Sequence, residues 1–242
     1  GYDSVEAFEE ILWMAFFPDR FQKDRIRPWT ERTKSLGLPE FLTRHMAKMV
    51  LLSGGASRYV SKNNTNIARI GWLSRALPEA TIVVPFREPT GHIRSMLRQH
   101  RGFAEAQKDA PFVREYMESI GHFEFGEAHR PIDFGGWLEG AAELSPETEA
   151  YWARYWVAAM ENVLAEAEGR ERVHLLSYDG LCADPEADLA TLGRRLGLGD
   201  DLVRHADRFR APTGHGAKPL DVPPDLAEEV SATHAKLTTR AI

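Results

Sequence analysis

Hydrophobic residues along this chain follow two patterns, helical spacing and short continuous runs. The runs at residues 82–86 and 173–176 predict buried strands, the first because it is β-branched and apolar on both faces. A third short strand is predicted at residues 58–61. Helices are predicted at residues 5–16, 39–52, 66–76, 89–101, 111–120, 146–169, 185–196, 200–209 and 226–237. Because strands alternate with helices, we predict an α/β fold with right-handed parallel crossovers.

Composition narrows the class of protein. A length of 242 residues predicts one large domain or at most two. The formal net charge of −6 argues against a general nucleic-acid-binding surface. The single cysteine, Cys182, cannot form an internal disulfide and fits a reducing compartment, so we expect a cytoplasmic protein. The longest strongly apolar stretch, residues 11–17, is too short to span a bilayer.

The run at residues 82–86 ends at an arginine, Arg87, and a helix is predicted to begin at Pro89. That helix carries Ser95, eight positions after Arg87. Open α/β sheets bind ligands at the carboxyl ends of their strands, where a guanidinium and a hydroxyl can hold a phosphate together. The alternative is that Arg87 pairs with a nearby carboxylate and Ser95 has no role. Pro85 fits poorly in a central strand, because it removes a ladder donor.

This spacing resembles the phosphate motif of sulfotransferases that use 3′-phosphoadenosine 5′-phosphosulfate (PAPS). Two further segments strengthen the likeness to the bacterial-type members of that family. Residues 62–70 and 77–80 are similar to the family's lysine-bearing turn and to the lead-in to its arginine strand. Residues 176–186 and 196–198 are similar to its Tyr-Glu and Gly-Leu module. The three modules occur in the family's order and cover about residues 3–202.

The resemblance implies a three-layer, P-loop-NTPase-like parallel sheet flanked by helices, with residues 1–242 as a single domain. It also implies transfer of a sulfuryl group from PAPS to a hydroxyl or amine of a small molecule, lipid or carbohydrate, releasing the nucleotide product PAP. Arg87 and Ser95 would hold the 3′-phosphate, and Lys62 would stabilise the leaving phosphate; the alternative for Lys62 is an ordinary solvated side chain. The family's Gly-rich 5′-phosphosulfate loop is not found, so we expect it upstream of Gly1.

The base that deprotonates the acceptor is expected to be His45, on the helix at residues 39–52, or one of His122, Glu124 and His129 in the loop at residues 121–140. Asn64 stands about where cytosolic family members carry a catalytic histidine. His122 and Glu124 alternate with aromatic residues, so they project together if the segment is extended, and we predict that they contact the acceptor. They could instead form a polar edge over anchoring phenylalanines. Metal binding by these two residues with His129 is a less favoured alternative.

A second binding loop is predicted at residues 210–218, where Gly214 and Gly216 leave backbone amides accessible to an anion and Lys218 adds positive charge. Family members close a basic, glycine-containing loop over the 3′-phosphate; the alternative here is a surface connector. Two other functions stay open. A small-molecule kinase would require ATP and Mg²⁺, and a non-catalytic module would bind a nucleotide without turnover.

Overall fold

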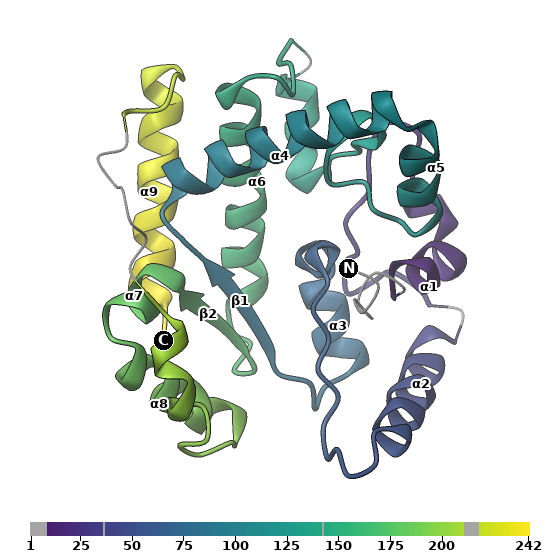
Figure 1. Ribbon diagram of the computed structural model, residues 1–242, viewed down its shortest axis with the longest axis vertical. Helices are drawn as coiled ribbons and strands as arrows, with labels where there is room; N and C mark the ends of the chain where they lie inside the picture. The colour runs from purple at the N-terminus through teal and green to yellow at the C-terminus, as the bar shows by residue number, and fades with distance from the viewer. Residues whose placement is uncertain (1–8, 36, 142, 211–217) are drawn as a thin grey trace. The chain divides into compact units, whose positions relative to one another are not determined.

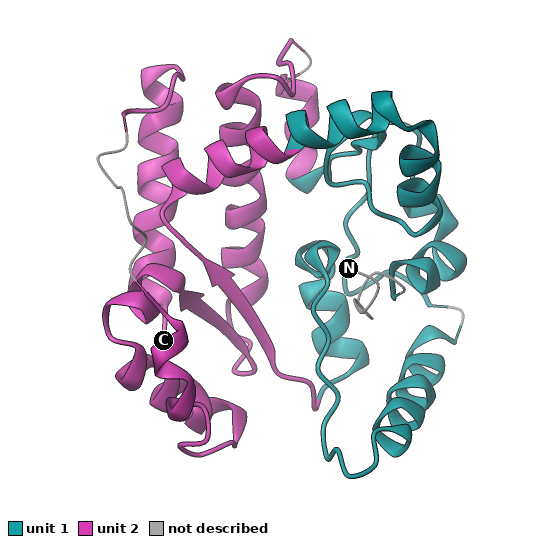
Figure 2. Cartoon of the chain, viewed as in Figure 1, with its two compact units in different colours: residues 1–78, 100–134 teal, residues 79–99, 135–242 magenta. Residues whose placement is uncertain are grey.

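The computed structural model describes residues 9–35, 37–141, 143–210 and 218–242. The chain divides into two compact units, the first formed by residues 1–78 and 100–134 and the second by residues 79–99 and 135–242 (Figure 2). We describe each unit by itself, and the single-domain organisation stays a prediction. None of the described helices combines the length and hydropathy needed to cross a membrane.

The second unit is built on a parallel pair of strands, β1 (Ile82–Phe86) and β2 (Val173–Ser177) (Figure 1). Ile82 pairs with Val173, and the register runs without interruption to Phe86 and Ser177. Two of the three predicted strands are therefore confirmed, with helices around a small parallel sheet, and within the described residues the sheet has these two strands. Pro85 is exposed on β1, which has a single neighbouring strand there, so its missing donor is tolerated.

Helices pack against this strand pair. In Figure 1, α6 (Glu149–Ala167) and α9 (Pro224–Arg240) run side by side, and both contact β2. Trp152 and Trp156 on α6 are buried, as their spacing of four residues predicts. Beyond β2, α7 (Tyr178–Ala183) and α8 (Pro185–Leu196) cover a leucine cluster. The second unit also contains the 3₁₀ segments η5 (Phe134–Ala141) and η6 (Val203–Arg208).

Local sequence explains where these helices begin. Thr148, Ser177 and Asp184 each precede a helix, and their side-chain oxygens accept backbone N–H groups of the first turn. Gly197 adopts a left-handed conformation and ends α8. The helix predicted at 200–209 is a shorter 3₁₀ segment, and α7 was not predicted.

The first unit is mainly helical. It contains α1 (Glu9–Phe16), α2 (Leu38–Leu52), α3 (Ile70–Ala76) and α5 (Pro111–Ser119). Three 3₁₀ segments, η2 (Pro18–Arg20), η3 (Asn64–Ala68) and η4 (Gly126–Ala128), connect them. Helix α4 (Pro89–Asp109) contributes residues 89–99 to the second unit and 100–109 to the first.

The core of the first unit is an aromatic cluster around a buried cation. Trp13, Phe17, Trp29 and Trp72 meet with ring centroids 5.1–5.9 Å apart. The guanidinium carbon of Arg69 lies 3.9 Å from the ring centroid of Trp13. Burial of the aromatic rings and cation–π attraction to Arg69 therefore both stabilise the core of the first unit.

Two predictions for the first unit were wrong. Residues 58–61 form no strand; the segment is extended but has no ladder partner among the described residues, and its side chains bond to α1 instead. The helix predicted at 66–76 is broken at Arg69, which separates η3 from α3. Arg69 has a φ of −140°, outside the helical region, and its side chain turns inward to the buried cluster.

Candidate functional site

The phosphate-binding residues predicted for the second unit follow the carboxyl end of β1. Arg87 is half-buried, and its Nη2 donates a hydrogen bond of 3.1 Å to the carbonyl oxygen of Gly91. Gly91 and Ser95 are four residues apart on α4, so they lie on the same helix face, one turn from each other. Ser95 is also half-buried. The Arg87 guanidinium thus contacts α4 at Gly91, one helical turn before Ser95.

The first turn of α4 is already capped from within the chain. The two carboxylate oxygens of Glu88 accept hydrogen bonds of 2.7 Å from the amides of Thr90 and Gly91. Burial opposes ionisation of Glu88, but these hydrogen bonds outweigh it and hold the pKa of the carboxyl below its ordinary value. The Glu88 amide in turn donates 2.6 Å to Asp179, which follows β2. A bound anion at this end would therefore rely on side chains rather than on helix amides.

The charge of Arg87 is not neutralised locally. Within the part of the chain that the structure describes, Arg87 forms no ion pair, which argues against the alternative of a carboxylate partner. Burial, and then the positive charge of Arg87, lower the pKa of His92 to about 4, so this histidine is neutral at pH 7. The Arg87 guanidinium therefore lies near two carboxylates, Glu88 and Asp179, without forming an ion pair with either in the described chain.

Tyr178 is an exposed aromatic residue that directly follows β2. A hydrogen bond with Cys182 raises the pKa of the Tyr178 phenol, and the nearby charge of Arg87 opposes this shift. Sequence reasoning placed Tyr178 in a family-like module but gave it no role. Its position in the sequence could have marked Tyr178 as a candidate ligand-contacting residue, because it is an aromatic residue directly after a buried strand, and ligands bind at the carboxyl ends of such strands.

Of the predicted C-terminal binding loop at residues 210–218, the structure describes Arg210 and Lys218, and Gly214 and Gly216 lie outside the described residues. Lys218 is exposed. The segment after it is tied to α4, because Arg94 donates 2.9 Å to the carbonyl oxygen of Pro219. Arg94 also pairs at 2.8 Å with Glu149, the first residue of α6. The segment that begins at Lys218 is thus held to α4 by Arg94, the residue that precedes Ser95.

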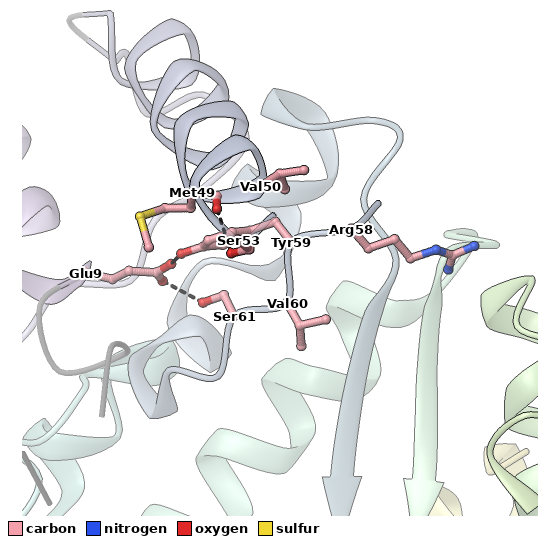
Figure 3. Close-up of a pocket in the computed structure, with 8 residues that line it drawn as sticks. All are labelled: Glu9, Met49, Val50, Ser53, Arg58, Tyr59, Val60 and Ser61. Atoms are coloured by element: carbon pink, nitrogen blue, oxygen red, sulfur yellow. Dashed lines mark hydrogen bonds between the residues drawn. The ribbon is translucent and has the colours of Figure 1, made fainter. Parts of the chain in front are cut away.

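In the first unit, the segment before Lys62 is held against the carboxylates at the start of α1. Tyr59 and Ser61 donate hydrogen bonds to Glu9, the second at 2.6 Å (Figure 3). Asn63 donates 2.7 Å to Glu10. These three residues alternate along an extended chain, so Lys62 faces the opposite side, and it is exposed there. The Lys62 side chain is solvated, as the alternative to a catalytic role predicts, but the hydrogen bonds of its neighbours fix its backbone.

The turn after Lys62 is fixed as well. The side-chain oxygen of Asn63 accepts a hydrogen bond of 2.9 Å from the amide of Thr65, so Asn63 caps the start of η3. Arg69, one turn beyond, is fully buried and binds both carboxylate oxygens of Glu10 at 2.6 and 2.7 Å. Glu10 therefore joins the lysine turn to the aromatic core.

Glu124 lies against this turn. The side-chain amide of Asn64 donates to the Glu124 carboxylate at 3.4 Å, although sixty residues separate them. His122 is half-buried, and its backbone amide donates 2.9 Å to Met117; its ring forms no hydrogen bond with any residue in the described ranges. Of the two predicted acceptor-contacting residues, the structure thus places Glu124 beside the lysine turn through Asn64.

The loop that carries Glu124 is pinned by buried polar residues of α4. The amide of Gly126 donates 3.2 Å to Nδ1 of His100, and Gln107 accepts hydrogen bonds from the amides of Glu127 and Ala128. Gly126 has a φ of +78°, and a Cβ there would collide with Gln107. This loop is therefore fixed in the folded state.

The metal-binding alternative gains no support from this geometry. His129 is half-buried beside His100, and its partial burial, followed by the proximity of His100, lowers its pKa to about 4. No cluster of three or more His, Cys, Asp or Glu side chains that could hold a metal ion occurs in the described ranges.

Comparison with known proteins found no match, whether among family models, curated proteins or solved structures.

Proposed function

We propose that this protein transfers a sulfuryl group from PAPS to a hydroxyl or amine acceptor. One observation carries the proposal: at the carboxyl end of a parallel strand, an arginine without an ion-pair partner in the described chain contacts Gly91 of α4, and Ser95 lies one turn further along that helix. A planar guanidinium and a hydroxyl suit the oxygens of a terminal phosphate. We assign Arg87 and Ser95 to the 3′-phosphate of PAPS, with Lys218 adding positive charge.

The proposal includes the fold of the site. We place β1 and β2 in a three-layer, P-loop-like parallel sheet, supported by their parallel pairing and by the helices that contact β2. In such sheets, ligands bind beyond the carboxyl ends of the strands. Residues 87–95 and 178–179 follow those ends here. We also propose a cytoplasmic location, on the basis of the single cysteine.

PAPS supplies the activated sulfuryl group, and the residues of this chain supply charge and a base. The Lys62 ammonium stabilises the negative charge that develops on the departing phosphate oxygen. Glu124 accepts the proton of the acceptor hydroxyl as that oxygen bonds to sulfur and the bridging bond to phosphate breaks. Asn64 orients the Glu124 carboxylate. We favour Glu124 over His122 because its carboxylate contacts the turn that carries Lys62.

The first experiment measures PAP binding by calorimetry. Arg87→Ala removes a charge-assisted contact worth about 1.5–3 kcal/mol, so we expect the affinity to fall about 10- to 150-fold. Arg98→Ala is the matched control, because Arg98 is an exposed arginine of the same helix, and its affinity should equal that of the wild type. If both variants lost the same PAP affinity, the overall positive charge of the helix, and not a specific contact of Arg87, would account for binding. Binding of ATP with Mg²⁺ in place of PAP would favour the kinase.

The second experiment separates chemistry from binding. Lys62→Ala and Glu124→Gln should slow single-turnover sulfuryl transfer by about 100-fold or more while leaving PAP affinity within about twofold. His122→Gln is the comparison variant, and its rate should fall much less. A larger loss in His122→Gln than in Glu124→Gln would move the base to the histidine. Tight PAP binding without turnover in the wild type would identify a nucleotide-binding module.

A further inference from the structure

Helix α2 ends in an apolar projection that the core does not cover. Leu51 and Leu52 are 80% and 82% exposed, and Val60, across the following turn, is 87% exposed. We call these three residues the apolar tip. Of the fifteen residues of α2, Leu38 and Leu42 near its start are buried. Two adjacent leucines exposed to this degree are unusual, because full burial of one is worth about 1.5–3 kcal/mol.

The tip lies within a stretch of uniform positive charge. Residues 41–62 contain four Lys or Arg residues and no Asp or Glu, whereas the whole chain carries 36 acidic and 30 basic residues. The four cations, all exposed, are Arg44, Lys48, Arg58 and Lys62. On α2, Lys48 lies between Phe41 and Leu52 at spacings of seven and four, so cations and apolar residues share the exposed stripe.

A cavity of about 210 Å³ adjoins the tip (Figure 3). Met49 and Val50 of α2 and Val60 of the tip line it, and the one carboxylate in its wall, Glu9, is bonded by Tyr59 and Ser61. Ser53 and Arg58 also line the cavity, so its wall is of mixed polarity, and Val60 is the residue of the tip that borders it.

We propose that the apolar tip inserts into the surface of an anionic lipid bilayer. Exposed leucines and an aromatic residue interleaved with cations are the features of segments that lie in the bilayer interface. The cations would meet the negative headgroups while the leucines enter the boundary of the acyl chains. A second copy of the chain fits less well, because a two-fold dimer through this face would bring four cations against four. The proposal does not depend on the sulfuryl-transfer activity.

Vesicle co-sedimentation of the full chain tests it. We expect binding to phosphatidylcholine vesicles that contain phosphatidylglycerol, and little binding to phosphatidylcholine alone. Binding should weaken in about 1 M salt, where the Debye length is about 3 Å. Leu51→Ser with Leu52→Ser should weaken binding at least tenfold. Arg44→Gln with Lys48→Gln should weaken it about thirtyfold, since each cation contributes roughly fivefold.

Phe112→Ser provides the control, because Phe112 on α5 is 73% exposed but lies outside the basic stretch; its binding should be unchanged. Thermal unfolding should be the same in all variants, since the altered side chains are exposed. Equal binding to both kinds of vesicle, or equal loss in the Phe112 variant, would overturn the proposal. So would a dimer in light scattering that the double serine variant converts to a monomer without any vesicle binding.

Discussion

Glu10→Gln tests whether the buried ion pair holds the lysine turn. In the folded chain, Glu10 binds Arg69 through both carboxylate oxygens and also accepts a hydrogen bond from Asn63. The glutamine is nearly the same size, so the change removes charge without creating a cavity. It leaves one neutral acceptor facing a guanidinium that has no contact with solvent.

The expected cost follows from the burial of Arg69. Breaking a buried ion pair by neutralising one partner typically costs about 3–5 kcal/mol, because the remaining charge is uncompensated. Burial already lowers the pKa of Arg69, against the opposing effect of Glu10, so the guanidinium depends on that carboxylate. The ring of Trp13 remains beneath Arg69 in the variant, but a cation–π contact contributes only about 2 kcal/mol even when desolvated.

Urea unfolding followed by tryptophan fluorescence measures this cost, because Trp13 and Trp29 surround the pair. Glu229→Gln is the control, since it breaks the solvent-exposed pair with Arg154, and it should cost no more than about 1 kcal/mol. If Glu10→Gln also cost less than about 1 kcal/mol, the pair would not stabilise the unit, and the account of how the lysine turn is fixed would be wrong.

The remaining predictions concern pH and the Glu124 loop. His92 and His129 have folded pKa values of about 4 against an ordinary 6.5, so the unfolded chain binds more protons between these values. The free energy of unfolding should therefore fall as the pH drops from 6.5 to about 4, by up to about 3 kcal/mol per histidine. Urea unfolding of His129→Gln should show a shallower dependence of this free energy on pH, and an unchanged dependence would contradict the prediction. Gly126→Ala should cost about 1–3 kcal/mol more than Gly135→Ala in the same assay. Both glycines have positive φ, but a Cβ at Gly126 would collide with Gln107, whereas no described atom lies within 4 Å of a Cβ at Gly135. Equal costs for the two variants would show that the loop at Gly126 shifts to accommodate the methyl group and is not fixed.

The local sequence pattern was sufficient to predict elements whose formation depends on their own side chains. The run at 82–86 and the run at 173–176 are strands because β-branched and leucine side chains pack on a partner that the fold provides. The segment at 58–61 was also predicted as a strand, yet no strand lies beside it in the described chain. A strand is defined by its ladder partner, which the segment's own sequence does not contain.

The length of α4 shows a second limit. The prediction ended at residue 101, before Gly102, but the helix continues to Asp109. A single glycine costs only about 1 kcal/mol in a helix, and Gln107 is buried against the loop at residues 126–128. Tertiary contacts therefore outweigh the local penalty.

Side-chain type and a period of 3.6 residues were enough to predict β1, β2 and most helix starts. The support of Asn63 by Glu10, and the contact of Asn64 with Glu124 sixty residues away, became visible in the folded chain alone. Such contacts depend on how separate elements pack, and no local period encodes them.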